Sequence, residues 1–361
     1  MTDYAMDVSE GLPRLPQNLS ELTAEWLTEA LACPYPGAEV TSVHYGTVLH
    51  GTCTKIRLLL NYNEAGHSCR LPPTMWAKCG FEAHSQSPHV AECSRSEVVF
   101  YRQRAPEGLL NVAKCYFGGL DRNSNGAFLL LEDLLARNVT FGFPKVRPID
   151  PQIAQRAVGM MARFHARWWN GPERARRETS AGAALTTDDW MSESAFEHCM
   201  HLPRFEYVLP ALRDRKRFVS AIHKLWDSNA QGARCLLLGD VALGNCFFEI
   251  DGTPGFLDLQ GDTFGCWAHD FTEFVLSALD IDARRTSERP LLEFYLEQLR
   301  SQGIDAPNFA NAWQQYRRNT LWLATAAVIP VTSQPEAVCI AYTQRAMAAV
   351  ADLDALDSFD R

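Results

Sequence analysis

The hydrophobic pattern of the chain changes character near Leu134, and this change most restricts the fold that the chain can adopt. Before it, short β-branched and apolar runs such as Val43–Leu60 and Thr74–Cys79 are separated by glycine and proline breaks, which is typical of β-strands. After it, apolar residues recur every three or four positions, which is typical of amphipathic helices. We therefore predict an α+β protein with a small β-rich N-terminal lobe, residues 1–133, and a larger, mainly helical C-terminal lobe, residues 134–361.

Within the N-terminal lobe the pattern predicts three strands, one helix and two further strands. The helix passes through Glu97, Val98 and Tyr101, and the last two strands lie around Leu110–Phe117 and Ala127–Leu131. This order of elements is the informative feature of the lobe.

The C-terminal lobe begins with a clear helix signal. Asp150 is a plausible N-cap and Pro151 suits the first helical position, because proline has no N–H to leave unpaired there. Further along, apolar strands are predicted at Cys235–Leu238, Cys246–Ile250 and Gly255–Leu259, with helices from there to the C-terminus.

Composition excludes several classes of function. The chain has 361 residues, 47% of them hydrophobic, and a net charge of −9, so it can bury a large core but has no general attraction for nucleic acid. Its 11 cysteines form no C-x-x-C pair, which argues against a disulfide framework or a zinc site.

The sequence shows no export signal and no membrane span. Asp3, Asp7 and Glu10 occupy the place where a signal peptide needs a basic start. The longest apolar run, Leu321–Val331, is interrupted by Pro330 and is much shorter than the ~20 residues of a membrane span. We expect a cytoplasmic protein without membrane partners.

The stretch Leu238–Asn245 carries the most specific pattern, Leu-Gly-Asp-Val-Ala-Leu-Gly-Asn, and Phe256–Gln260 reads Phe-Leu-Asp-Leu-Gln. An apolar strand leads to Asp240, Asn245 follows, and Asp258 ends the second strand of a predicted hairpin. Phosphoryl transfer needs a carboxylate that can reach the attacking hydroxyl and hard oxygen ligands that hold magnesium against phosphates. These residue types suit Asp240 as the base and Asn245 and Asp258 as magnesium ligands.

Turn formation is the competing interpretation, because Asp and Asn are frequent in turns and D-x-x-x-x-N alone is a weak signal. The strand context and the second aspartate favour the functional interpretation. An acid between Leu257 and Leu259 is costly to bury unless it is paired or bound to a metal ion.

Together these residues resemble the aminoglycoside phosphotransferase superfamily, and within it the ecdysteroid kinase-like branch. That branch reads H-G-D-x-x-x-x-N, then D-F-Q or D-W-Q, then an aspartate before a helix. The matching residues here are Gly239-Asp240, Asn245, Asp258-Leu259-Gln260 and Asp270. The resemblance covers about residues 40–350 and implies a protein kinase-like fold of two lobes, ATP and Mg²⁺ as cofactors, Asp240 as catalytic base, Asn245 and Asp258 at the metal, and Asp270 as a brace for the catalytic loop.

The N-terminal lobe offers a second set of residues that resembles the family. Lys78 lies in the strand Met75–Cys79, where a kinase-like lobe holds the lysine that binds the α- and β-phosphates. Glu97, placed at the start of its helix, resembles the glutamate that pairs with this lysine. A lysine at a strand end is usually a solvated edge residue, but the order of Lys78, Glu97 and Asp240 favours the functional interpretation.

The segment Phe128–Leu134 resembles the hinge of the family, an apolar strand that turns at Glu132-Asp133-Leu134 into the helical lobe. Backbone groups near Glu132 and Leu134 are then expected to bind the adenine edge.

Gly46 and Gly51 bracket Thr47–Thr52, a candidate loop over the nucleotide phosphates, in which Gly51 would let the backbone come close. The pattern lacks G-x-G-x-x-G, so ordinary hairpin glycines are at least as good an explanation.

Two residues depart from the family pattern. Leu238 replaces the usual histidine and Leu259 replaces an aromatic residue. Because that histidine generally orients the loop and gives nothing to the transferred group, its absence puts rate and loop rigidity in doubt more than reaction type.

The prediction for function is ATP-dependent phosphorylation of a hydroxyl group on a small organic molecule. Only eleven residues separate Asp258 from Asp270, which leaves no room for the activation segment of a protein kinase. Two alternatives stay open: a nucleotide-binding pseudokinase or scaffold, and a kinase whose phosphate serves as leaving group in an elimination. Trp267 is kept as a possible wall of the acceptor pocket.

Overall fold

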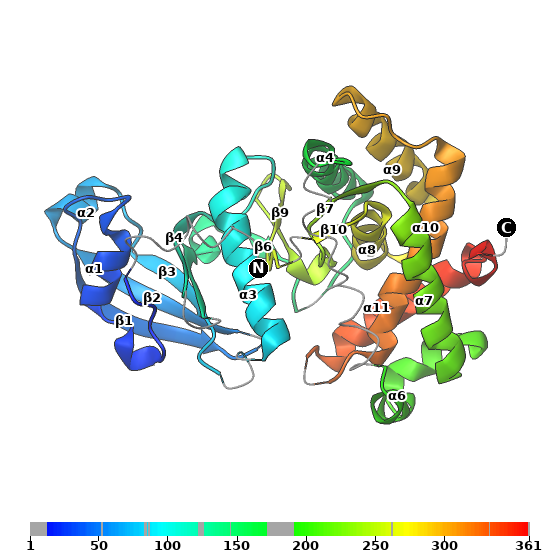
Figure 1. The fold of residues 1–361 in the computed structure, drawn as a ribbon, viewed down its shortest axis with the longest axis horizontal. Helices are drawn as coiled ribbons and strands as arrows, with labels where there is room; N and C mark the ends of the chain where they lie inside the picture. The colour runs from blue at the N-terminus through cyan, green and yellow to red at the C-terminus, as the bar shows by residue number, and fades with distance from the viewer. Residues whose placement is uncertain are drawn as a thin grey trace. The chain divides into compact units, whose positions relative to one another are not determined.

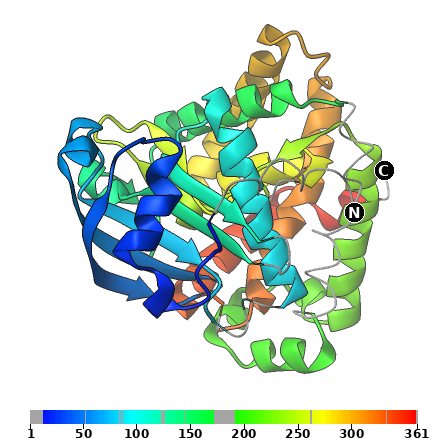
Figure 2. The same cartoon turned by 60° about the vertical axis from the view of Figure 1, so that its left-hand side comes forward.

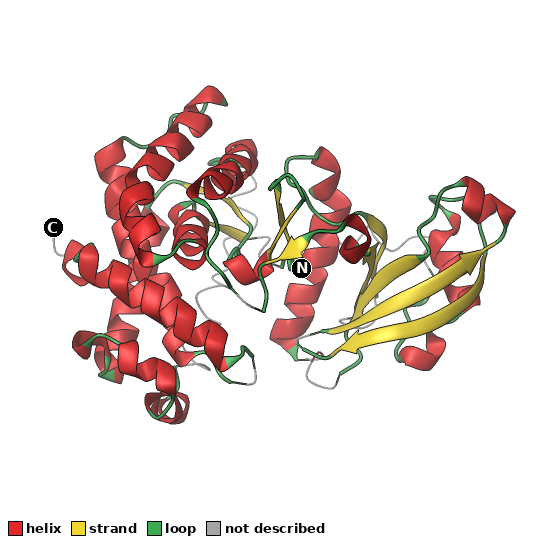
Figure 3. Cartoon of the chain, turned by 180° about the vertical axis from the view of Figure 1, so that it is seen from behind, coloured by secondary structure: helices red, strands yellow, loops and turns green. Residues whose placement is uncertain are grey.

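The computed structural model describes residues 13–51, 53–82, 85, 87–121, 126–144, 146–171, 191–260, 263–331 and 333–359. The chain forms two compact units: unit 1 comprises residues 1–108 and 112–139, and unit 2 comprises residues 109–111 and 140–361. Among the described residues each unit has five strands, which form one sheet in unit 1 and two small sheets in unit 2, and most of the α-helices belong to unit 2 (Figures 1 and 3). The predicted α+β class is confirmed. The acidic N-terminal residues Asp3, Asp7 and Glu10 lie outside the described residues.

Unit 1 is built on a five-stranded antiparallel sheet of order β1-β2-β3-β5-β4. Its elements are α1 (Ala24–Ala32), β1 (Val40–Leu49), β2 (Thr54–Tyr62), α2 (Glu64–Ser68), β3 (Thr74–Cys79), α3 (Pro88–Gln103), β4 (Cys115–Leu120) and β5 (Ala127–Glu132).

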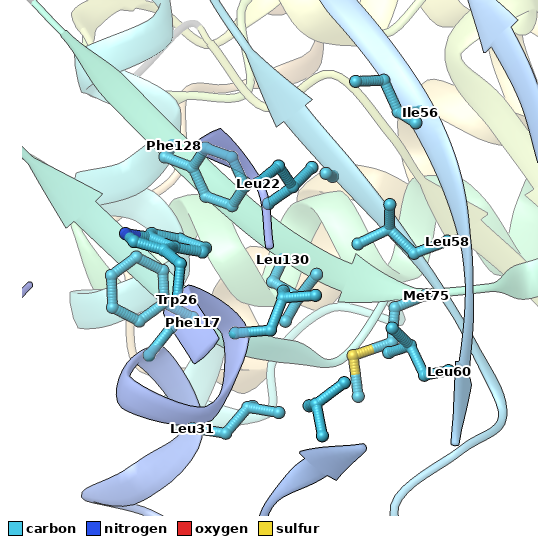
Figure 4. Close-up of a cluster of buried hydrophobic side chains, with 14 of the residues drawn as sticks. Leu22, Trp26, Leu31, Ile56, Leu58, Leu60, Met75, Phe117, Phe128 and Leu130 are labelled. Atoms are coloured by element: carbon cyan, nitrogen blue, oxygen red, sulfur yellow. The ribbon is translucent and has the colours of Figure 1, made fainter. Parts of the chain in front are cut away.

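The two faces of this sheet have different partners. Alternate residues of a strand point to opposite faces, and Met75, Ala77 and Cys79 of β3 join the apolar core beneath α1, where Trp26 packs edge-on against Phe128 with ring centroids 4.8 Å apart (Figure 4). The opposite face of the sheet meets α3, the cyan helix of Figures 1 and 2. The alternation therefore places Lys78 on the α3 side.

Two predicted boundaries in unit 1 were wrong. Helix α3 begins at Pro88, with Ser87 as N-cap, so Glu97 lies in the middle of the helix and not at its start; the proline at the first helical position was the overlooked signal. Strand β4 begins at Cys115 rather than near Leu110, and Leu109–Asn111 belong to unit 2.

Unit 2 is mainly helical and contains two small sheets, one of order β10-β7 and one of order β6-β8-β9. Its elements are β6 (Thr140–Phe141), α4 (Pro151–Arg167), α6 (Glu193–Met200), α7 (Arg215–Gln231), β7 (Arg234–Leu237), β8 (Cys246–Phe248), β9 (Pro254–Phe256), β10 (Thr263–Cys266), α8 (Ala268–Ala278), α9 (Ile281–Ser301), α10 (Phe309–Ala324) and α11 (Glu336–Asp352).

Helix α4 starts as predicted, with the Asp150 side chain accepting a hydrogen bond from Gln152 N at 2.7 Å and Pro151 at the first helical position. Helix α8 is central to the unit: all its residues are buried, and it packs against α4, α9, α10 and α11. A helix that is buried on every side carries polar groups only where they have partners. None of the described helices is long and apolar enough to cross a membrane.

Candidate active site

The loop Leu238–Asn245, called here the catalytic loop, follows β7 and ends in the short 3-10 helix η9 (Leu243–Asn245). The strand before it ends at Leu237, so Asp240 lies in the loop, where it is exposed to solvent. The predicted hairpin is present as β8 and β9, but β7 pairs with β10 in a separate sheet.

Backbone N–H groups of the catalytic loop are held by side chains from one face of α8. Asp270 accepts hydrogen bonds from Leu238 N at 2.6 Å and Gly239 N at 3.1 Å. Glu273 accepts one from Val241 N, and Ser277 one from Leu243 N, each at 2.8 Å. Positions i, i+3 and i+7 of a helix share one face, so the spacing of the three acceptors aligns them along the loop.

Gly244 completes the anchoring, since its N–H donates to the Tyr342 hydroxyl of α11 at 2.9 Å. Gly142 supports the loop from another side. A Cβ atom at Gly142 would lie 1.8 Å from the Leu243 carbonyl oxygen, so only glycine allows this approach of the two backbones.

Asp270 also binds two histidines and is fully buried. Its carboxylate receives His165 Nε2 at 3.1 Å and His269 Nδ1 at 3.2 Å, and His165 Nδ1 lies 2.7 Å from the Tyr295 hydroxyl. Burial alone would raise the pKa of Asp270, but the hydrogen bonds from His165 and His269 outweigh it and hold that pKa well below its usual range. Asp270 is therefore an ionised acceptor beneath the loop, which is the bracing contact that the resemblance implied.

Asn245 and Asp258 lie close to Asp240. The Asn245 Nδ2 donates to the Asp240 carbonyl oxygen at 3.2 Å, which leaves the amide Oδ1 as the acceptor end of that side chain. Asp258 lies two residues beyond β9 rather than at its end, and has a φ of +52°. Such left-handed backbone is uncommon for a residue other than glycine and concentrates at functional sites.

The charges of the two aspartates influence each other. Removal of water by the surrounding protein, followed by the charge of Asp258, raises the pKa of Asp240 to about 6, although the carboxylate keeps an open side. The Asp258 carboxylate and the Asn245 amide oxygen are hard oxygen ligands that suit a divalent cation, and Asp240 lies beside them. The structure thus brings together the three residues predicted for catalysis and metal binding.

In unit 1, Lys78 and Glu97 form a buried ion pair. Their Nζ and Oε2 atoms are 2.5 Å apart, and the residues are 7% and 2% exposed. A small pocket is lined by both side chains together with Cys53, Ser94 and Phe128. Lys78 is therefore not a solvated strand-edge residue, and it occupies a position fixed by α3.

The hinge segment is anchored through Asp133 rather than Glu132. Asp133 is buried and accepts hydrogen bonds from Arg57 Nε at 2.8 Å and Trp76 Nε1 at 3.0 Å. Glu132 ends β5 and points its carboxylate to Lys114 N and Arg137. Leu134 opens the 3-10 helix η5 (Leu134–Arg137), and the first N–H of a helix has no acceptor within that helix.

The glycines of the candidate phosphate loop differ in their surroundings. Gly46 lies inside β1, where a Cβ atom would come within 3.1 Å of Leu59 Cδ1 and 3.3 Å of the Arg57 carbonyl. It is thus a packing glycine and not the edge of a loop. Gly51 lies between β1 and β2, where a Cβ atom would meet the Cys53 carbonyl oxygen at 3.9 Å, an ordinary contact, and Thr52 lies outside the described residues.

Trp267 does not line a site. It is fully buried, stacks on Tyr295 with centroids 5.0 Å apart, and donates to Gln315 Oε1 at 2.7 Å. The prediction of a pocket wall was wrong, because this indole belongs to the core around α8.

Comparison with protein families matches residues 83–317, well over half of the chain, to the phosphotransferase enzyme family, APH. The chain belongs to this family. Among curated proteins no match is found.

Several solved structures resemble this APH protein. The microcompartment-associated aminopropanol kinase has a TM-score of 0.50 and 12% identity, over 90% of this chain and 97% of that one. Similarity extends to the aminoglycoside phosphotransferase APH(3'')-Id from Streptomyces rimosus ATCC10970, with a TM-score of 0.44 and 13% identity over 86% of this chain and 98% of that one. The choline kinase LicA from Streptococcus pneumoniae has a TM-score of 0.45 and 12% identity over 91% of this chain and 98% of that one. The predicted kinase-like fold is confirmed.

Four residues of the APH protein's loop support were not predicted from the sequence: His165, Glu273, Ser277 and Tyr342. A signal for two of them was present. Glu273 and Ser277 lie three and seven positions after Asp270 in the mainly apolar Phe271–Ala278, and this helical spacing puts all three on one face.

Proposed function

We propose that this APH protein transfers the γ-phosphoryl group of ATP to a hydroxyl group of a small organic molecule. The carrying observation is that Asp240 sits on a loop whose backbone is fixed by α8 and lies beside Asn245 and Asp258. Transfer of a phosphoryl group asks the protein mainly for positioning and charge stabilisation, and this loop supplies both.

Each residue has a distinct role in the proposal. Asp240 accepts the proton of the attacking hydroxyl, and its raised pKa brings it nearer to the ideal for a base at neutral pH. Lys78, held by Glu97, neutralises α- and β-phosphate charge. The backbone at Glu132 and Leu134 binds the adenine edge.

Asn245 and Asp258 are the residues that would hold Mg²⁺. The protein would supply only one amide oxygen and one carboxylate. This small number suits Mg²⁺, which usually takes one or two carboxylates from the protein and its remaining ligands from substrate phosphates and water. When bound, Mg²⁺ stabilises the negative charge that develops on the transferred group.

Leu238 in place of the usual histidine does not indicate that catalysis has been lost. The Leu238 side chain is buried, and the loop is oriented through the Leu238 N–H and Asp270. We therefore prefer an active kinase to a pseudokinase, and we propose membership of the ecdysteroid kinase-like branch on the Asp258-Leu259-Gln260 pattern.

The proposal is tested by incubating the protein with ATP, Mg²⁺ and a panel of small alcohols. A phosphoester product is expected, detected by mass spectrometry. Asp240→Asn should abolish transfer and leave nucleotide binding largely intact, because the carboxylate is needed only for the proton. Asp258→Ala should weaken Mg²⁺-dependent nucleotide binding. Unchanged turnover of Asp240→Asn would remove Asp240 from its role.

The same assay separates the alternatives. A product that has lost water and carries no phosphate would show elimination after phosphorylation. Nucleotide binding without any turnover across the panel would indicate a pseudokinase.

A further inference from the structure

Glu273 is a buried carboxylate, 6% exposed, whose two oxygens have different partners. Its Oε2 accepts the N–H of Val241 and its Oε1 accepts the indole N–H of Trp322 on α10, each at 2.8 Å. Trp322 is itself packed against His269, with ring centroids 4.8 Å apart. The carboxylate is therefore fixed from the side of α10 and presents its other oxygen to the catalytic loop.

The Val241 N–H belongs to the same peptide group as the Asp240 carbonyl. That carbonyl oxygen accepts the Asn245 Nδ2 at 3.2 Å, so both polar atoms of this peptide group are held, one by Asn245 and one by Glu273. A peptide group is planar, and fixing its two ends fixes its orientation. The Cα–C bond of Asp240 lies in the plane of that peptide group, so its direction is fixed with it.

We propose that Glu273 is a positioning residue for Asp240, a role that rests on the proposed phosphoryl transfer. Glu273 holds the orientation of the peptide group that follows Asp240, and Trp322 holds the Glu273 carboxylate in place. Asp270 holds the start of the loop at Leu238 and Gly239, so Glu273 adds a second anchor at the base itself.

The chemistry of the two donors explains why a carboxylate is present. Two N–H groups converge on one side chain, and a carboxylate offers each an oxygen. Glutamine has the same shape but only one oxygen, so its NH₂ group must face either Val241 N–H or the Trp322 indole. Removing the indole N–H by Trp322→Phe lets the glutamine oxygen turn to Val241.

This predicts rescue between two substitutions. In Glu273→Gln the single oxygen cannot accept both N–H groups, and with that oxygen on the Trp322 indole the peptide group after Asp240 loses its acceptor. Above about pH 8, where burial and the Asp240 charge leave Glu273 ionised, we expect amide exchange in Leu238–Asn245 to become about 10- to 100-fold faster, the range for a hydrogen bond to a charged group. With Mg·ATP and water as acceptor at the same pH, kcat should fall by about the same factor while KM for ATP stays within about threefold. Trp322→Phe alone should lower kcat less, and the double variant should recover most of both losses.

Glu288→Gln is the matched control. Glu288 is also buried on a helix and accepts two hydrogen bonds, from Arg284 Nη1 and the Tyr316 hydroxyl, each at 2.8 Å, but it does not contact the catalytic loop. It should leave exchange in the loop and kcat unchanged even if it lowers thermal stability.

The two readouts separate the failure of this inference from the failure of the proposed function. Loop exchange and kcat in Glu273→Gln within about twofold of wild type, or a double variant no better than Glu273→Gln, would overturn the role of Glu273. A wild-type protein that neither binds nor hydrolyses Mg·ATP would overturn the proposed function, and with it the catalytic purpose of the anchor, whereas rescue of exchange would still show that Glu273 holds the loop.

Discussion

Replacement of Asp270 by asparagine should lower the unfolding free energy of unit 2 more than any conservative change at the surface does. The carboxylate accepts four N–H groups, from Leu238, Gly239, His165 and His269. Asparagine has one oxygen, and its NH₂ group would face N–H donors, so about two donors lose their acceptor. A buried unsatisfied donor costs about 1–3 kcal/mol.

The unfolding free energy should therefore fall by about 2–6 kcal/mol, in agreement with a cost of about 3–5 kcal/mol for breaking a buried charge pair. The total unfolding free energy of a domain is about 5–15 kcal/mol, so this loss is a large fraction of it. Urea unfolding followed by tryptophan fluorescence measures it, and most of the tryptophans lie in unit 2. The matched control is Asp282→Asn, a side chain 91% exposed that pairs with Arg285, which should leave the midpoint unchanged.

The pH dependence adds a second check. The folded-state pKa of Asp270 lies well below its usual range, so its stabilising contribution is present above about pH 4, the ordinary pKa of an aspartate, and is lost as pH falls further. Asp270 also raises the pKa of His269 against the opposing effect of burial, so the difference between wild type and Asp270→Asn should be at least as large at about pH 5 as at pH 7 and should shrink below about pH 4. A midpoint equal to that of wild type at pH 7, or a difference that grows below about pH 4, would refute the reasoning.

Three further outcomes are expected. Removal of water by the surrounding protein, and then the charge of Asp258, raises the pKa of Asp240 to about 6 although the residue keeps an open side. Burial, and then the charge of Asp240, raises the pKa of Glu273 to about 8. Because each residue acts when ionised, kcat/KM should rise with pH in two steps. Glu273→Gln should lack the upper step, measured in a pH profile at saturating Mg²⁺. Gly142→Ala should displace the Leu243 carbonyl and reduce kcat by about 10-fold or more, since a displacement of about 1 Å can cost 100-fold, while circular dichroism stays native; unchanged kcat would contradict the close approach. Lys78→Met should raise KM for ATP, and an unaltered KM would remove Lys78 from the phosphates.

The strand that carries Lys78 could be predicted with its boundaries, and the reason is local. Two prolines precede Thr74–Cys79 and mark its start, and a run of apolar residues continues to its end. The start of α3 was missed although Pro88 marks it, because the apolar periodicity used for the prediction begins only near Glu97. Local signals thus located both elements. Their ends were predicted correctly only where the proline signal was used together with the apolar pattern.

The catalytic loop shows where local reasoning stops. The proximity of Asp240, Asn245 and Asp258 could be predicted from their spacing along the chain, while their roles in catalysis and metal binding stay predictions. The partners of the loop could not be placed in the same way, since Val241 and Glu273 are 32 residues apart and Gly244 and Tyr342 are 98 apart. The positive φ of Asp258 likewise depends on packing and has no signature in its neighbours.

The leucine at position 238 follows from the same anchoring. A polar side chain that is buried needs partners of its own, whereas the Leu238 side chain is apolar and 2% exposed. The loop obtains its orientation from backbone N–H groups, which any residue other than proline provides, and from acceptors on α8 that do not depend on the side chain at 238. A histidine there would therefore duplicate an orientation that Asp270, Glu273 and Ser277 already impose, and its absence is no argument that catalysis has been lost.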